Sequence, residues 1–342
     1  MTGIARVMIV GLMLALVAGL FGGLSRLLLE LPIANVLKVY HGPLLCGFVF
    51  PGLIGLERAV AIGSWWSWLA PMFALVGLAL AFSQGLVSIA LILAVSVALL
   101  AQQLFLWRRS PGVDGEVASL AAGLLLYSDW IWASGGGYFE SASGWASFLV
   151  LLIAAERLEL SFAARSRALP ARLVSLLIAG GVFGGQSKLI GLGWLALALW
   201  LCLYDLARRN AKRSGLPAFS ARAVLLGYGW LALSGFQMAF WGLSGANLDR
   251  VLHGVFVGFV LSMVMAHAPI IFPALLKFPM RFSNWLYLPL LLLHGSLAVR
   301  ASGSLSWGAA GNLLAVLFFA LLAALHLGGA ERPWLSSSRG AS

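Results

Sequence analysis

Charged residues are scarce in this chain of 342 residues. They make up 10% of the sequence and apolar residues make up 61%, whereas a soluble protein of this length would carry about 25% charged residues. Cysteine is also rare: the chain has two, Cys46 and Cys202, and both stand in apolar stretches. A disulfide or a cysteine-based metal cluster is therefore not expected. The composition excludes a soluble globular protein and predicts an all-α polytopic integral membrane protein.

Apolar runs of about 20 residues, the length that crosses a bilayer as a helix, occur twelve times. They predict a single transmembrane domain over 1–330, with helices at about 4–25, 39–56, 67–84, 86–106, 117–134, 144–162, 172–187, 189–206, 223–243, 251–273, 282–299 and 307–328. A short cytoplasmic tail over 331–342 is expected to follow. The first run lacks a small-residue cleavage site, so no cleavable signal peptide is expected.

Positive charge is unevenly distributed along the chain, whose net charge is +11. With the N-terminus inside, five of the 22 lysines and arginines fall on the outer side: Arg26, Lys38, Lys188, Arg250 and Arg300. The other 17 fall on the inner side, as the positive-inside rule predicts for twelve spans with both termini in the cytoplasm. The excess of positive charge thus reflects the topology of the chain in a bacterial inner membrane. Anionic lipid is the expected partner, and nucleic acid is not.

One short motif opens two of the predicted helices. Lys38-Val39-Tyr40-His41-Gly42 returns as Arg250-Val251-Leu252-His253-Gly254, and each copy then runs on to Gly-Phe-Val. An imidazole and a cation are costly at the start of an apolar helix and usually have a purpose there. The chain has only five histidines, so the duplication predicts a ligand site shared by the two helices.

The predicted topology places the two copies at the same depth. Both helices enter from the outer side, so His41 and His253 lie in the outer half of the membrane. The motif cations come one helical turn nearer the outer surface on about the same face. Gly42 and Gly254 leave the backbone bare beside each histidine, so a broad, flat ligand could approach closely.

A second recurrence involves the inner ends of the predicted helices 39–56 and 144–162. They end in Glu57-Arg58 and Glu156-Arg157, and helix 251–273 carries His267 at about this level. These helices are four apart in order, which predicts three four-helix modules around a pseudo-threefold axis. The Glu-Arg pairs are expected to be cytoplasmic-end anchors with local ion pairs. Gly180-Gly181 with Gly184-Gly185 predicts a small-residue face for close helix packing.

The layout resembles subunit I of the haem-copper oxidases and, more closely in size, the NnrS family of haem- and copper-containing twelve-span proteins of the nitric-oxide response. The matching features are His41-Gly42 on the second helix, the segment from Phe50 to Gly55, and a histidine near the outer end of the tenth helix. In the oxidases these two positions ligate a six-coordinate haem. The resemblance therefore implies a haem, with nitric oxide or an electron donor as partner.

Two departures from these families narrow that implication. The oxidase copper centre uses histidines on helices 6 and 7, and the ranges 144–162 and 172–187 contain none. Oxygen reduction and proton pumping are therefore not expected. The NnrS pattern has a second histidine beside the first on helix 2, where Pro43 and Leu44 stand here. The resemblance thus implies at most one haem, and copper is the less favoured metal.

Together these features predict a b-type haem with His41 and His253 as axial ligands of its iron. Lys38 and Arg250 would bind its propionates, and Asp129 near the outer end of the fifth helix would orient an imidazole. The function expected is redox or nitric-oxide-related chemistry. The reaction and the oligomeric state do not follow from the sequence.

The histidines also have simpler interpretations. His41 and His253 could be interfacial residues hydrogen-bonded to neighbouring helices, with the motif cations snorkelling to headgroups. His294 is either a third ligand or a packed helix–helix hydrogen bond. His267 beside Pro269 either accepts a bond freed by a kink or serves a proton route.

A secondary transporter is the competing function class, because twelve spans with cytoplasmic termini are also a carrier layout. Carriers usually show a six-plus-six repeat, whereas the histidine motif recurs eight helices apart. Asp129 is the main membrane-embedded acid available for ion coupling. An optical spectrum separates the two classes, because haem absorbs visible light.

Overall fold

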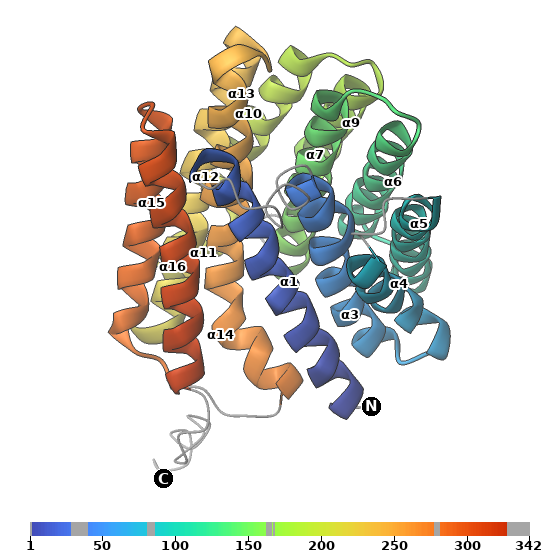
Figure 1. The fold of residues 1–342 in the computed structure, drawn as a ribbon, viewed down its shortest axis with the longest axis horizontal. Helices are drawn as coiled ribbons and strands as arrows, with labels where there is room; N and C mark the ends of the chain where they lie inside the picture. The colour runs from blue at the N-terminus through green and yellow to red at the C-terminus, as the bar shows by residue number, and fades with distance from the viewer. Residues whose placement is uncertain are drawn as a thin grey trace.

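The computed structural model describes residues 2–28, 40–80, 86–161, 166, 168–276 and 281–326. Within these ranges all regular elements are helices and none is a strand. The helices form one bundle (Figure 1). We call the end where α1 (Thr2–Leu28) begins and α16 (Leu305–His326) ends the lower end. The opposite end, where α13 (Gly245–His253) begins, is the upper end. The all-α prediction is confirmed, and the tail 331–342 lies outside the described residues.

Each of the twelve predicted ranges overlaps a helix of the described residues, with ends that differ by several residues. Eight helices are long and apolar enough to cross a membrane: Gly3–Ser25, Tyr40–Ile62, Val87–Arg109, Glu140–Leu160, Ser187–Tyr204, Gly215–Trp241, Asn247–Ile271 and Leu305–His326. Trp65–Leu80 and Ala168–Phe183 are shorter apolar helices. The other two ranges correspond to α6 (Val113–Ala133) and α15 (Tyr287–Ala301). The chain is a multi-pass helical membrane protein.

Two of the long helices contain π-helical segments. Tyr40–Ile62 includes the π-helical η1 (Leu44–Val49) and then α3 (Phe50–Ile62). After α13 the chain continues through the π-helical η4 (Gly254–Leu261) into α14 (Ser262–Leu276). The remaining elements are η2 (Trp65–Trp68), α4 (Leu69–Leu80), α5 (Leu86–Arg109), α7 (Tyr138–Leu160), α9 (Ala168–Phe183), α10 (Ser187–Tyr204), α11 (Ala207–Asn210), α12 (Gly215–Trp241) and η5 (Asn284–Leu286).

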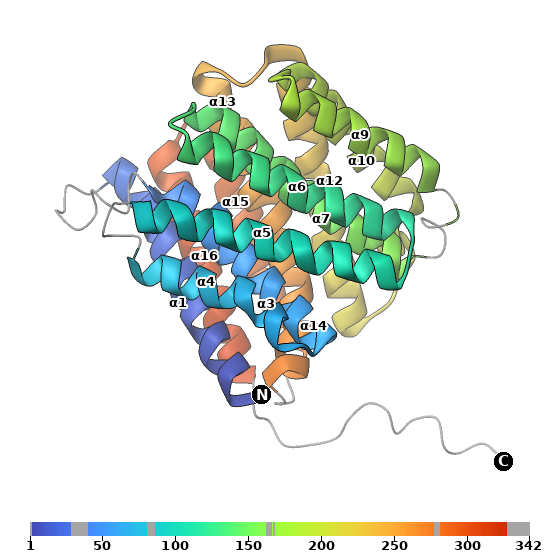
Figure 2. The same cartoon turned by 90° about the vertical axis from the view of Figure 1, so that its right-hand side faces the viewer.

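The second, sixth and tenth helices of the order are the most buried of the eight candidate spans. In the most apolar stretch of Glu140–Leu160, 83% of the residues are buried; the values are 72% for Asn247–Ile271 and 61% for Tyr40–Ile62. The other five have 33–44%. Figure 2 shows α4, α5 and α6 side by side on one outer face of the bundle. A central position of these three helices agrees with the recurrence in the sequence.

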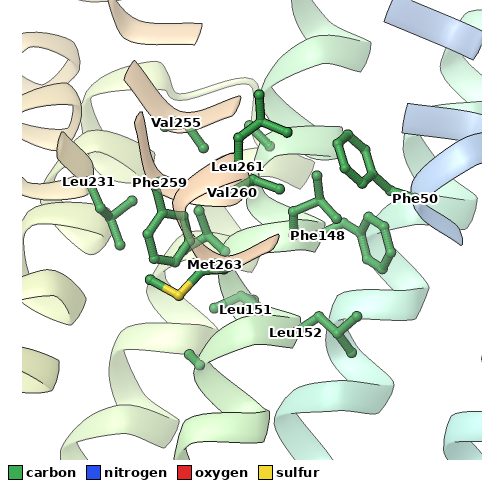
Figure 3. Close-up of a cluster of buried hydrophobic side chains, with 14 of the residues drawn as sticks. Phe50, Phe148, Leu151, Leu152, Leu231, Val255, Phe259, Val260, Leu261 and Met263 are labelled. Carbon is green, nitrogen blue, oxygen red and sulfur yellow. The ribbon is translucent and has the colours of Figure 1, made fainter. Parts of the chain in front are cut away.

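The three central helices contribute to one apolar core. Phe50 from α3, Phe148 from α7, and Val260 and Leu261 from η4 belong to the same cluster of buried side chains. Figure 3 shows Phe50, Phe148 and Leu261 directed into this core from their separate helices. The two helices that carry the histidine motif therefore share a core with α7.

One close helix crossing joins α10 and α12 through glycine. A Cβ on Gly191 would lie 2.4 Å from the backbone nitrogen of Ala239, and one on Gly235 would lie 2.5 Å from the backbone of α10. Of the glycines predicted for close packing, Gly181 packs against α10, but a Cβ on Gly180 would have nothing within 4 Å. This close crossing thus lies outside the predicted glycine cluster, since contact depends on which helix faces each glycine.

Candidate functional site

Both histidines of the duplicated motif lead into π-helical backbone. His41 stands three residues before η1, and His253 directly precedes η4. At the end of η1 the N–H of Phe50 donates to the carbonyl of Leu45, five residues back. π-helical turns are rare and occur frequently at functional sites, because they break the regular helical ladder. The duplicated sequence therefore has a duplicated backbone distortion.

The ring of His253 is held on one side by acidic and carbonyl oxygens. Its Nδ1 lies 3.0 Å from the backbone oxygen and 3.1 Å from Oδ1 of Asp249, one turn earlier. Asp249 in turn accepts two hydrogen bonds from Arg300, at 2.9 and 2.6 Å. An imidazole oriented through Nδ1 presents Nε2 on the opposite side, as in metal-ligating histidines.

Two neighbours of His253 make contacts with other helices. Arg250 donates through Nε to the carbonyl of Ala301 at the end of α15, at 2.9 Å. A Cβ on Gly254 would lie 2.2 Å from Oγ of Ser234, so α12 fills the space expected to be open beside this glycine. The small size of Gly254 permits close approach of α12.

The first copy of the motif faces α1. His41 is half-buried at the start of the helix Tyr40–Ile62, and a Cβ on Gly23 would lie 3.3 Å from its Cδ2. Gly42 beside it is buried. Lys38 lies outside the described residues. His41 therefore packs against α1, and the propionate role of Lys38 stays a prediction.

Asp129 lies in a buried polar cluster near the upper end of α6. Trp145 donates from Nε1 to Oδ1 at 2.7 Å, and Oδ2 is hydrogen-bonded to the hydroxyl of Ser96. A Cβ on Gly47 of η1 would lie 3.5 Å from Oδ1. The hydrogen bonds of this carboxyl group thus join α5, α6 and α7, and neither partner is an imidazole.

His294 joins α15 to two neighbouring helices. Trp230 donates from Nε1 to Nδ1 at 2.8 Å, and Oγ of Ser262 lies 3.3 Å from Nε2. An indole nitrogen can only donate, so Nδ1 carries no proton and the ring is the neutral Nε2–H tautomer. Both ring nitrogens contribute to helix packing. This geometry favours the packed hydrogen bond over the third-ligand alternative.

One partly buried and one buried ion pair hold the central helices at the lower end. Arg58 donates to Glu156 at 3.0 Å, which joins α3 to α7. Arg157 donates from Nε and Nη2 to the two oxygens of Asp205, at 2.6 and 2.8 Å. The ion pairs run between helices and not locally as predicted, because adjacent residues of a helix do not face each other.

His267 extends this network to the tenth helix. Its Nε2 lies 3.4 Å from Nη1 of Arg157, and its Nδ1 lies 2.8 Å from the carbonyl of Met263. Arginine can only donate, so Nε2 accepts and Nδ1–H donates to the carbonyl. His267 thus does not accept a freed backbone bond, and its proton role stays a prediction. Contacts of Arg58 and Arg157 link all three central helices.

Sequence reasoning missed three residues of these clusters. Asp205 follows an apolar run, so the sequence predicts a loop residue at this position. In the structure it is buried and also accepts a hydrogen bond from the hydroxyl of Tyr228 at 2.9 Å. Asp249 carried a usable signal, since it precedes His253 by one helical turn. Asp205 and Tyr228 had no such signal, because their partners are distant in sequence.

A cavity of about 470 Å³ opens at the lower end beside this network. Its lining includes Asp205, Ser161, Tyr204, Arg208 and Lys212. Among the described residues, no three histidine, cysteine or acidic side chains form a group that could hold a metal ion. An axial pair of histidines on a haem does not require such a group.

Comparison with known proteins gives one family. The chain matches the family described as "Domain of unknown function (DUF8744)" over residues 6–327. No curated protein and no solved structure matches it. The chain belongs to the DUF8744 family.

Proposed function

We propose that this DUF8744 protein binds one b-type haem through His41 and His253 and serves redox or nitric-oxide-related chemistry. The main support is the orientation of the His253 ring. Its Nδ1 is held by Asp249, so that Nε2 points away from Asp249. The placement of both histidines before π-helical segments of central helices supports the same site.

The residue types at the ligand positions are those that a b-type haem uses. His41 and His253 would supply the axial imidazoles, and the haem, when bound, would supply one-electron transfer or nitric-oxide binding. Arg250 is tied to the Ala301 carbonyl through Nε, so a propionate would have to be bound by the terminal amino groups. Because α12 fills the space beside Gly254, the ring would approach His253 from another side.

Absorption spectroscopy tests the proposal. We expect the wild-type protein, made with an adequate haem supply, to show a six-coordinate b-type spectrum. His41→Ala and His253→Ala should each remove or convert it, since each removes one axial bond. His294→Ala and His326→Ala are matched controls, because these rings hydrogen-bond to other protein groups, and they should leave the spectrum unchanged. Wild-type protein that is colourless and gains no absorbance on haem addition would falsify the haem site.

Twelve spans with both termini in the cytoplasm form part of the same proposal, with three modules of four helices. The charge asymmetry supports it, as does the position of the start of α1 and the end of α16 at the same end of the bundle (Figure 1). Reporter fusions after Lys212 should read cytoplasmic, and fusions between Gly245 and Asn247 should read external. If both fusions report the same side, the predicted topology is wrong, and the prediction that the two histidines lie at equal depth is wrong with it.

A secondary transporter is the second candidate function. The 470 Å³ cavity at the lower end favours it, because Asp205 belongs both to this cavity and to the buried network of the central helices. Buried ionisable groups beside a cavity are typical of substrate and ion pathways in membrane proteins. Colourless protein that takes up a solute in vesicles would favour this candidate.

A further inference from the structure

Asp129 is a fully buried acid whose partners are all neutral. Its relative exposure is 0%, and its hydrogen-bond partners Ser96 and Trp145 are exposed by no more than 1%. The titratable group that faces it from η1 is the thiol of Cys46; α5 and α7 present Ser96 and Trp145. An isolated carboxylate in such an apolar setting is strongly disfavoured compared with the neutral acid.

The hydrogen bonds of this cluster can accommodate a proton on Asp129. Trp145 can only donate, so Oδ1 is an acceptor. The hydroxyl of Ser96 has one hydrogen, and its Oγ lies 3.0 Å from the carbonyl of Ile92, to which it can donate. When it does so, the hydrogen between Ser96 and Oδ2 must come from the carboxyl group.

We propose that Asp129 is a proton-binding site, with the proton on Oδ2 directed at Ser96. Loss of that proton would leave a carboxylate, to which the Ser96 hydroxyl can turn and donate while Trp145 continues to donate to Oδ1. The hydroxyl therefore serves both protonation states without any helix movement. A charge change here would be felt at η1, because Gly47 brings that segment against Oδ1.

The site does not depend on the haem proposal. A proton bound in the upper half of the bundle could accompany either electron transfer or solute transport. Glu156 differs from Asp129 in its partners: it pairs with the cation of Arg58 at 3.0 Å, whereas Asp129 has neutral hydrogen-bond partners.

Infrared spectroscopy of the full-length protein in detergent tests the proposal. Near neutral pH we expect a carbonyl stretch of a protonated carboxylic acid that shifts in heavy water and is lost in Asp129→Asn. Trp145→Phe should move this band to higher frequency, because Oδ1 loses its donor. Glu156→Gln should leave the band in place.

Two results would overturn the assignment. One is a wild-type spectrum that differs from Asp129→Asn only in carboxylate bands at every pH at which the protein is folded. The other is a carboxylic band at the same frequency in wild type and Trp145→Phe. The Trp145→Phe variant retains Asp129, so this comparison tests the assignment even if Asp129→Asn does not fold.

Discussion

Asp205→Ala is expected to lower the free energy of unfolding by about 3–5 kcal/mol, the usual cost of removing one partner from a buried ion pair. The carboxylate accepts from Nε and Nη2 of Arg157, from the hydroxyl of Tyr228 and from the backbone N–H of Ala207. Alanine would leave a buried guanidinium without its counter-charge. Chemical unfolding in detergent micelles, followed by circular dichroism, measures the change.

Two controls separate the buried charge from the loss of a single hydrogen bond. Tyr228→Phe removes one donor and keeps the ion pair, so a loss of about 1 kcal/mol is expected. Arg172→Ala breaks the more exposed pair with Glu116, and solvent screening should make its effect small. Equal losses for Asp205→Ala and Tyr228→Phe would contradict a structural role for the ion pair.

Gly191→Ala and Gly235→Ala are each expected to cost about 1–3 kcal/mol, the range for inserting an extra methyl group into a well-packed core. Each new Cβ would meet backbone atoms of the opposite helix at about 2.5 Å, and backbone cannot move aside like a flexible side chain. The helices α10 and α12 would have to separate. The same unfolding measurement in detergent checks this expectation.

Matched glycines are available on neighbouring helix surfaces. A Cβ on Gly180 of α9 or Gly229 of α12 would have nothing within 4 Å. Alanine at either position should be neutral or stabilise by about 0.5–1 kcal/mol, because it lowers the entropy of the unfolded chain. The double variant at Gly191 and Gly235 should cost less than the sum of the two, since both strain one crossing. Equal effects at all four glycines would refute the close crossing.

The class of the protein and the approximate positions of its apolar helices were predictable from sequence. Lipid requires each crossing segment to satisfy its own backbone hydrogen bonds and to present apolar side chains, so runs such as 4–25 and 307–328 are visible locally. The histidine motif was visible for the same reason, because His41 and His253 have matching neighbours in the chain.

The surroundings of these histidines were only partly predictable. Asp249 is one helical turn from His253, so its contact follows from helical spacing. The closeness of Ser234 to Gly254 does not follow from helical spacing, because it depends on how α12 packs against η4. The π-helical turns after both histidines were not predicted from the motif, although they recur with it.

The sequence by itself determined that this chain is a helical membrane protein with a repeated histidine motif and charged helix ends. The tertiary structure alone decided which charges meet: Arg58 pairs with Glu156, 98 residues away, and Arg157 pairs with Asp205, 48 residues away. A buried charge is stabilised by the opposite charge nearest to it in space. Helix packing brings these groups together, and their pairing cannot be predicted from neighbouring residues in the sequence.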